Sequence, residues 1–252
     1  HQFPEPMLPD TWNMDKFQMA FDYGGERILG LKLRVSKEVV GDQGLKPLYR
    51  AIEVAEQFDK PVCVHVTDPP VPMSELAEVL RPGDIFCHMF TGKYRSIYED
   101  GKLPDAIWKA RERGVIFDAC HGKMNHTFSV AEKAAADGFL PDVITTDLTF
   151  KTWAKQPVFG MPHVMSKFFL LGMTENQIIE RVTCNPARLM KMEDQLGTLR
   201  PGTCADVTIL RVIEKDILFY DSQGDTRTGQ RYFAPMATIV DGQMMYRSHE
   251  LY

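Results

Sequence analysis

The stretch LKPLYRAIEVAEQFDKPVCVHV, residues 45–66, gives the clearest indication of the fold class. Residues 45–58 place apolar side chains at the spacing of one helix face, and Asp59 with Pro61 predicts that the helix ends there. The apolar run at 61–66 then predicts a buried strand. A helix that leads directly into such a strand is typical of a parallel sheet covered by helices on both faces.

The same alternation continues in both directions from this stretch. Further strands are predicted at 28–35, 84–90, 115–120 and 142–147, and further helices at 73–80, 103–114, 129–138, 160–172 and 174–191. Thr174 and Gln177 form a capping-box pattern at the start of the last helix. After residue 194 the pattern changes to short strands with Pro-Gly and Asp-Gly turns, which predicts a small β part beside an α/β part.

The composition excludes several classes of protein. The 252 residues are 44% hydrophobic and 25% charged, values typical of a globular protein and not of a disordered or coiled-coil chain. The formal net charge is −5 without a basic stripe, so we expect neither nucleic acid nor an anionic membrane as partner. No apolar run approaches the roughly 20 residues that cross a bilayer.

The five cysteines are scattered along the chain and form no CxxC pair: Cys63, Cys87, Cys120, Cys184 and Cys204. This pattern favours reduced thiols in a cytoplasmic protein. Two of the cysteines, Cys87 and Cys120, directly precede a histidine. Because neighbouring strand residues point to opposite faces, we expect both thiols to turn away from that histidine and to act as small buried hydrophobic groups.

Polar side chains recur at or near the ends of the predicted strands: Lys32, His65, His88, His121 and Asp147. Successive members are between 23 and 33 residues apart, about the length of one strand–helix unit. Because functional groups of parallel α/β folds gather at the C-terminal ends of the strands, these side chains should point to one centre. Imidazoles, a carboxylate and a lysine are the composition of a hydrolytic metal site.

Each of these residues also has a structural explanation. A histidine at a strand end can be a hydrogen-bonded core residue, and His121 could orient a substrate as readily as bind metal. Asp147 could cap the helix that follows it. Lys32 is expected to be buried between Leu31 and Leu33, where it either meets a carboxylate or loses its charge. A neutral lysine amine can react with carbon dioxide to form a carbamate that bridges two metal ions. His126 and His163 are expected on the surface with neither role.

Six segments, in this order, resemble the amidohydrolase superfamily, and within it the dihydroorotase-like amidohydrolases and deacetylases: GLKLRVS (30–36), PVCVHVTDPP (61–70), RPGDIFCHMF (81–90), ERGVIFDACHG (112–122), GFLPDVITTDL (138–148) and VTCNPARLM (182–190). The resemblance implies a (β/α)8 TIM-barrel metallohydrolase. Residues 1–194 would then be a partial barrel that forms the catalytic domain, and residues 195–252 would be the C-terminal segment of a small β-sandwich.

The same resemblance implies two zinc ions per subunit and a role for each candidate residue. Lys32 would be the carboxylated lysine that bridges the metals, with His65 and His88 as ligands of the more exposed metal. Asp147 would bind the buried metal and act as general base and acid, and His121 would border the substrate pocket. The expected reaction is hydrolysis of an amide or ester bond in an acetylated or similar small molecule. A homo-oligomer is also expected.

The sequence departs from the family in two places. The HxH pair that holds the buried metal is absent, and the only histidine before Lys32 is His1, so we expect an N-terminally truncated chain. Its parallel sheet would be open at the first strands and poorly stable alone. Thr149 stands where related proteins often have histidine, which bears on substrate choice.

Two other functions are compatible with the same residues. The first is a non-catalytic protein that uses the fold as a binding or assembly scaffold, because folds are reused freely. The second is a metal-dependent lyase or isomerase.

Overall fold

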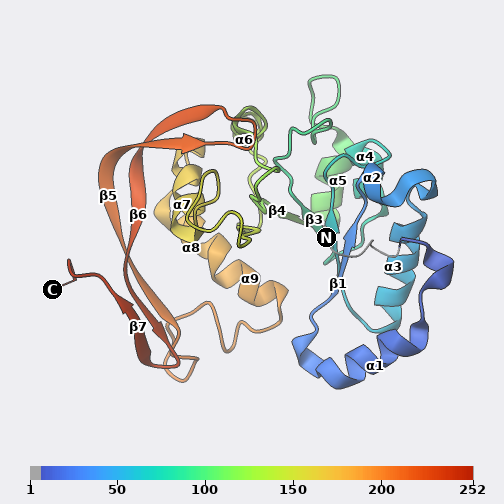
Figure 1. Ribbon diagram of the computed structural model, residues 1–252, viewed down its shortest axis with the longest axis horizontal. Helices are drawn as coiled ribbons and strands as arrows, with labels where there is room; N and C mark the ends of the chain where they lie inside the picture. Colours follow the sequence, from blue (N-terminus) through green and yellow to red (C-terminus); the bar gives the residue numbers. More distant parts are fainter. Residues whose placement is uncertain (1–6, 252) are drawn as a thin grey trace. The chain divides into compact units, whose positions relative to one another are not determined.

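The computed structural model describes residues 7–251, so His1 lies outside the described residues. The chain divides into two compact units, His1–Asp118 and Ala119–Tyr252. The first holds a four-stranded parallel sheet and the second a three-stranded antiparallel sheet (Figure 1). The predicted α/β fold with a smaller C-terminal β part is therefore confirmed. The predicted domain boundary at residue 194 stays a prediction.

The first unit follows the predicted alternation of strands and helices. Its elements are η1 (Pro9–Thr11), α1 (Met14–Gly24), η2 (Gly25–Arg27), β1 (Leu31–Arg34), α2 (Lys37–Val40), η3 (Gly41–Gln43), α3 (Lys46–Gln57), β2 (Val62–His65), α4 (Met73–Val79), β3 (Ile85–Cys87), α5 (Asp105–Arg113) and β4 (Ile116–Asp118). The strand order is β1-β2-β3-β4. Helix α1 was not predicted; it buries none of its residues and begins where the Asn13 side chain accepts a hydrogen bond from the Lys16 amide.

The two faces of the parallel sheet differ in character. One face is apolar and fully or almost fully buried, with side chains from Leu33, Val62, Val64, Phe86 and Phe117. Helix α3 contacts β1 and β2, and its own apolar side chains are buried. The opposite face carries polar side chains, because successive residues of a strand point to alternate sides. The candidate site of this unit lies on that second face.

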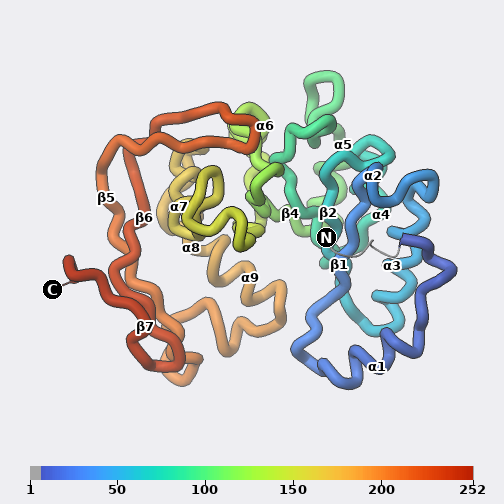
Figure 2. The backbone as a smooth tube through the Cα atoms, viewed as in Figure 1, coloured from blue at the N-terminus to red at the C-terminus, as the bar shows by residue number. Residues whose placement is uncertain are grey.

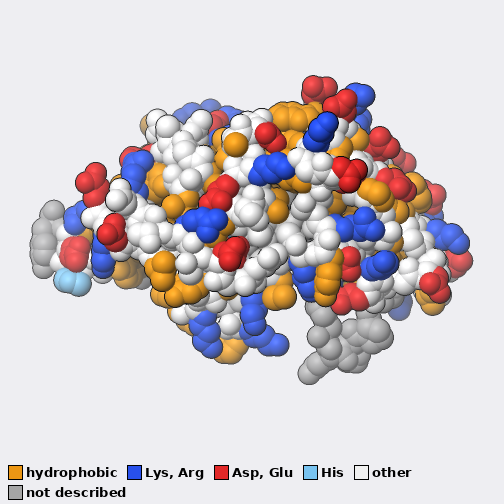
Figure 3. Space-filling view, turned by 90° about the horizontal axis from the view of Figure 1, so that it is seen from above, with side chains coloured by type: hydrophobic (Ala, Val, Ile, Leu, Met, Phe, Trp, Pro, Cys, Tyr) orange, Lys and Arg blue, Asp and Glu red, His pale blue; other side chains and the backbone are white. Residues whose placement is uncertain are grey.

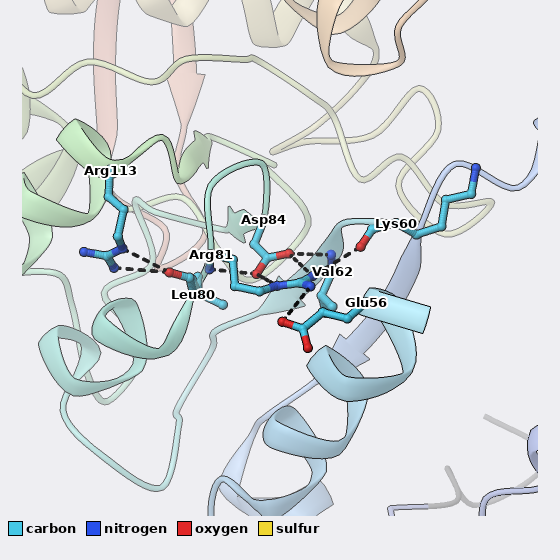
Figure 4. Close-up of polar contacts among 7 residues, drawn as sticks. All are labelled: Glu56, Lys60, Val62, Leu80, Arg81, Asp84 and Arg113. Atoms are coloured by element: carbon cyan, nitrogen blue, oxygen red, sulfur yellow. Dashed lines mark hydrogen bonds and ion pairs between the residues drawn. The ribbon is translucent and has the colours of Figure 1, made fainter. Parts of the chain in front are cut away.

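A buried carboxylate holds the start of the parallel sheet together (Figure 4). Asp84 is fully buried and accepts hydrogen bonds from the amides of Val62 and Arg81, both at 2.8 Å. The guanidinium of Arg81 donates to both carboxylate oxygens, at 2.9 and 3.1 Å, and to the Lys60 carbonyl at 3.2 Å. The hydrogen bond to Asp84 raises the pKa of Arg81 above its usual value. This cluster joins the beginning of β2 to the turn before β3.

The second unit contains helices followed by a long hairpin. Its elements are α6 (Phe128–Ala136), α7 (Met161–Lys167), η4 (Phe168–Leu171), α8 (Glu175–Val182), α9 (Cys184–Leu189), β5 (Val207–Tyr220), β6 (Thr226–Val240) and β7 (Gln243–Arg247). Strands β5 and β6 run side by side along most of their length (Figure 2). The predicted capping box of Thr174 and Gln177 is confirmed. The single helix predicted at 174–191 is wrong, because the backbone leaves the helical conformation at Thr183.

The predicted strand at 142–147 is not a strand of the described sheets. Its carbonyls still accept parallel hydrogen bonds: Ala119 donates to Val143, His121 to Thr145 and Gly122 to Thr146, at 3.0–3.1 Å. The segment is therefore extended and paired over a short distance. It ends at Asp147, whose φ of 45° interrupts the extended conformation.

The turn of the hairpin is fixed to the helices of the same unit. The buried carboxylate of Asp221 accepts a hydrogen bond from the amide of Phe128, the first residue of α6, at 3.0 Å. Arg227 on β6 forms two hydrogen bonds with the carboxylate of Glu132, at 2.6 and 3.0 Å. A carboxylate at a helix N-terminus is favourable because the unpaired amides and the helix dipole both attract negative charge. The hairpin turn thus acts as the cap of α6.

Charge is mixed on the face of the molecule that Figure 3 shows. In the face shown in Figure 3, acidic and basic side chains alternate and no broad area carries one sign. This distribution agrees with the small net charge of −5. Among residues 7–251, no helix combines the length and the apolar character needed to cross a membrane.

We expect Asp84→Asn to lower the free energy of unfolding by about 3 kcal/mol, because an amide cannot accept from all the donors around the buried carboxylate. The free energy is measured by urea denaturation of the purified protein. The matched control is Glu53→Gln, which alters an exposed ion pair with Arg50 and should change the value by less than about 0.5 kcal/mol. Equal effects of the two variants would contradict the structural role of Asp84.

Candidate active site

Strand register gathers the candidate residues of the first unit on one face of the parallel sheet. Arg34 pairs with His65, and His65 pairs with Cys87 on the next strand. Lys32 and Cys63 are paired two residues earlier and therefore lie on the same face. The sequence-predicted Lys32 and His65 are thus brought onto one surface.

His88 reaches this surface by a different route. It follows the last residue of β3, and continued strand geometry would turn it to the opposite face. Instead its φ is 72°, a left-handed conformation that redirects the side chain. The His88 ring meets the His65 ring edge-on, with ring centroids 4.4 Å apart. Two of the predicted metal ligands are therefore neighbours.

Lys32 does not have the environment that the sequence predicts. The residue is exposed, so the expectation of a buried lysine is wrong. The physical reason lies in β1, which pairs only with β2 among the described strands and presents Lys32 on its polar face. The Lys32 Nζ donates hydrogen bonds to the Sγ atoms of Cys63 and Cys87, each at 3.3 Å. The bridging carbamate stays a prediction.

Cys63 and Cys87, the two cysteines beside Lys32, belong to the candidate site, and sequence reasoning did not include them. The expectation that Cys87 is only a small hydrophobic group is wrong, because its thiol contacts the lysine amine. The hydrogen bond with Cys87, together with burial, raises the pKa of Cys63, so this thiol stays protonated, although Lys32 acts in the opposite direction. The period of two along β2 is the signal that could have placed Cys63 beside His65.

The electrostatic environment keeps His65 neutral. Burial, followed by the charges of His88 and Arg34, lowers the pKa of His65 to about 2. A histidine must be neutral to bind a metal ion, since the ligand is the lone pair of a ring nitrogen. Two adjacent imidazoles with thiols beside them are a donor set that suits zinc. The residues present in this unit therefore fit a metal ion.

In the second unit, Asp147 presents an exposed carboxylate in the left-handed backbone region, which aspartate tolerates better than most residues. Gly122 lies directly against it. A Cβ atom at Gly122 would come within 2.6 Å of Asp147 Oδ2 and within 3.1 Å of the Asn125 side-chain nitrogen. A side chain at Gly122 would therefore push this carboxylate aside, a constraint that sequence reasoning did not identify.

His121 is fully buried, and both of its ring nitrogens have partners. Nδ1 lies 2.8 Å from the Gly122 carbonyl oxygen, and Nε2 lies 2.7 Å from Lys167 Nζ. Burial, with smaller effects from His126 and Lys167, lowers the pKa of His121 well below its usual range. The role of His121 at the border of the substrate pocket stays a prediction.

The surface positions predicted for His126 and His163 are wrong. Both residues are buried, because aromatic rings surround them. His126 stacks on His121 with ring centroids 4.4 Å apart, and His163 packs 4.9 Å from the Phe219 ring. Burial, with a smaller effect of Lys167, lowers the pKa of His163 to about 4.

Lys32, His65 and His88 belong to the first unit, and His121 and Asp147 belong to the second. The participation of Asp147 in the same metal site stays a prediction.

The chain is similar in sequence to known deacetylases. Residues 199–246 match a deacetylase-like composite domain. A protein named deacetylase from Enterococcus faecalis is 33% identical over 220 residues, which are 86% of this chain and 59% of that protein. A deacetylase from Agrobacterium fabrum is 32% identical over 237 residues, or 94% of this chain and 58% of that protein. The chain thus spans somewhat more than half the length of these relatives.

Several solved structures are also similar to this chain. A crystal structure of an adenine deaminase matches with a TM-score of 0.89 and 31% identity, covering 94% of this chain and 64% of that one. A dihydroorotase matches with a TM-score of 0.85 and 31% identity, covering 98% and 64%. A D-hydantoinase, at 13% identity and a TM-score of 0.63, supports the fold alone.

These matches extend over 86–98% of the chain. The chain belongs to the amidohydrolase superfamily, in the branch of its deacetylase relatives.

Proposed function

We propose that the protein is a metal-dependent hydrolase that removes an acetyl group from a small molecule by cleaving an amide or ester bond. The observation that carries this proposal is the contact between His65 and His88 on the polar face of the parallel sheet, beside Lys32. The names of the deacetylase relatives support the acetyl group as the part removed.

The proposed cofactor is zinc, two ions per subunit in the intact enzyme. His65 and His88 would hold one ion, Asp147 would bind the other, and Lys32, as its carbamate, would be shared by both. When bound, zinc would supply Lewis acidity to the substrate carbonyl and would lower the pKa of water towards neutrality. The neutral state of His65 supports this assignment, because no proton has to leave the ring before it binds.

The proposed role of Asp147 is proton transfer. Its carboxylate would take the proton of the attacking water and deliver it to the nitrogen or oxygen of the leaving group. Exposure of the side chain supports this role, because the carboxylate has to meet water and substrate. We propose in addition that His121 borders the pocket, and that the protein is a cytoplasmic homo-oligomer.

One observation favours a second candidate function. The crystal structure of an adenine deaminase covers 94% of this chain at a TM-score of 0.89. Deamination and deacetylation of an amide both hydrolyse a carbon–nitrogen bond, and the product identifies the reaction. Acetate release from an acetylated substrate supports the first function, whereas ammonia release from a nucleobase supports the second.

Metal removal should abolish activity. We expect the full-length protein, purified without chelator, to contain zinc by elemental analysis and to release acetate from N-acetyl and O-acetyl compounds. Dialysis against a chelator should remove the metal and, because the substrate carbonyl then lacks its Lewis acid, the activity as well. Added zinc should restore both. A full-length protein that is folded, contains no metal and still hydrolyses these compounds would contradict the proposal.

Asp147→Asn should lower kcat by about 100-fold or more, because the amide cannot accept the proton. Folding should be unchanged, since the side chain is exposed, and circular dichroism with thermal denaturation measures this. The matched control is Asp194→Asn, which alters an aspartate whose side chain is 94% exposed, and it should retain full activity. Equal turnover by both variants would remove Asp147 from the mechanism.

A further inference from the structure

Lys167 is a buried cation that the proposed mechanism does not use. It is the last residue of α7 and is 1% exposed. Its Nζ lies 2.7 Å from His121 Nε2, 2.7 Å from the Pro157 carbonyl oxygen and 2.6 Å from the Tyr220 carbonyl oxygen. An ammonium group has three N–H donors, so these three acceptors satisfy it completely. Such complete satisfaction is what a buried charge requires.

This geometry decides the protonation state of His121. The Gly122 carbonyl can only accept, so the Nδ1 atom of His121, 2.8 Å away, must carry the proton. The Nε2 atom is then the acceptor of a hydrogen bond from Lys167. The ring is therefore neutral, protonated at Nδ1, and held on both sides. Burial of the ring acts in the same direction, because it disfavours the charged imidazolium.

The fixed ring in turn fixes the backbone next to Asp147. The amides of His121 and Gly122 donate to the carbonyls of Thr145 and Thr146, each at 3.0 Å. Gly122 also lies against the Asp147 carboxylate. Asp147 itself is exposed and has a left-handed backbone, so burial does not hold it in place. Its position depends on the paired segment beside it.

We propose that Lys167 is a positioning residue for Asp147: its ammonium holds His121 as the Nδ1-protonated tautomer, and His121 with Gly122 sets the place of the carboxylate. The inference rests on the proposed function of Asp147 as the proton-transferring group. It also joins that carboxylate to the C-terminal hairpin, because Lys167 donates to Tyr220 at the end of β5.

The charges around Lys167 are consistent with this role. Burial lowers the pKa of Lys167 to about 7, and the carboxylate of Asp221 acts against this and favours the ammonium form. The other titratable groups near it are the imidazoles of His121, His126 and His163, all buried and with lowered pKa values. A neutral histidine can accept from the ammonium, whereas a protonated one would repel it.

The first experiment observes His121 directly. In the wild-type protein at about pH 6, where Lys167 is below its pKa and an ordinary histidine titrates, nitrogen-15 NMR of the imidazoles should show His121 protonated at Nδ1 and not at Nε2. In Lys167→Met, which keeps a long side chain without the charge, the tautomer should become mixed. The backbone amide signals of Gly122 and Asp147 should also move. Lys215→Met, which alters an exposed lysine of β5, should change none of these signals.

The second experiment measures hydrolysis of para-nitrophenyl acetate by the zinc-loaded full-length protein. Lys167→Met should lower kcat by about 10- to 100-fold with little change in KM, because misplacing a catalytic group slows the chemical step more than substrate binding. Zinc content and circular dichroism should match the wild type. If Lys167→Met does not fold, Gly122→Ala replaces it. This variant should displace Asp147 and lower kcat while His121 keeps its tautomer.

Each outcome decides between the claims. The positioning role is overturned if the His121 tautomer is unchanged in Lys167→Met, or if the Gly122 and Asp147 signals do not move. This NMR result decides without any activity assay. Unchanged kcat in Lys167→Met or in Gly122→Ala also overturns it. Full activity of Asp147→Asn overturns the proposed function instead, and with it the reason for positioning that carboxylate, while the NMR result still establishes whether Lys167 sets the tautomer.

Discussion

The alternation of side chains along parallel strands is the constraint on which the first unit depends. It places Leu33, Val62 and Val64 on the face that helices bury, and it places Lys32 and His65 on the other face. Shifting one strand by a single residue would exchange the two sets and destroy both the core and the candidate site. Burial of apolar side chains therefore holds the polar residues in register, although those residues contribute little to the packing themselves.

The second unit is held together around a buried cation, whereas the first unit depends on the register of its strands. Lys167 connects three backbone segments that are distant in sequence, through His121, Pro157 and Tyr220. A buried ammonium is costly unless every N–H donor has an acceptor, so these segments must keep their places together. The hairpin turn at Asp221 adds a further connection by capping α6. In our proposal, the proton-transferring carboxylate of Asp147 is thus positioned by Lys167 through His121.

Most of the fold was predictable because its signals are local. The helix at α3 and the strand at β2 follow from apolar periodicity and from the residues that end them, and the capping box at Thr174 follows from a three-residue spacing. The errors also have local causes. Helix α1 carries Met14, Phe17 and Phe21 at helical spacing, a local signal that was overlooked, and the segment before Asp147 is extended without joining a named strand.

Residue type and spacing were enough to predict the parallel α/β pattern, the superfamily and the candidate residues. The surroundings of each residue became known from the folded structure. It exposed Lys32, placed two thiols beside it, and buried His126, His163 and Lys167. Burial and hydrogen-bond partners come from segments far apart in the chain. No local pattern encodes them, and they decide which group is charged and which is held in place.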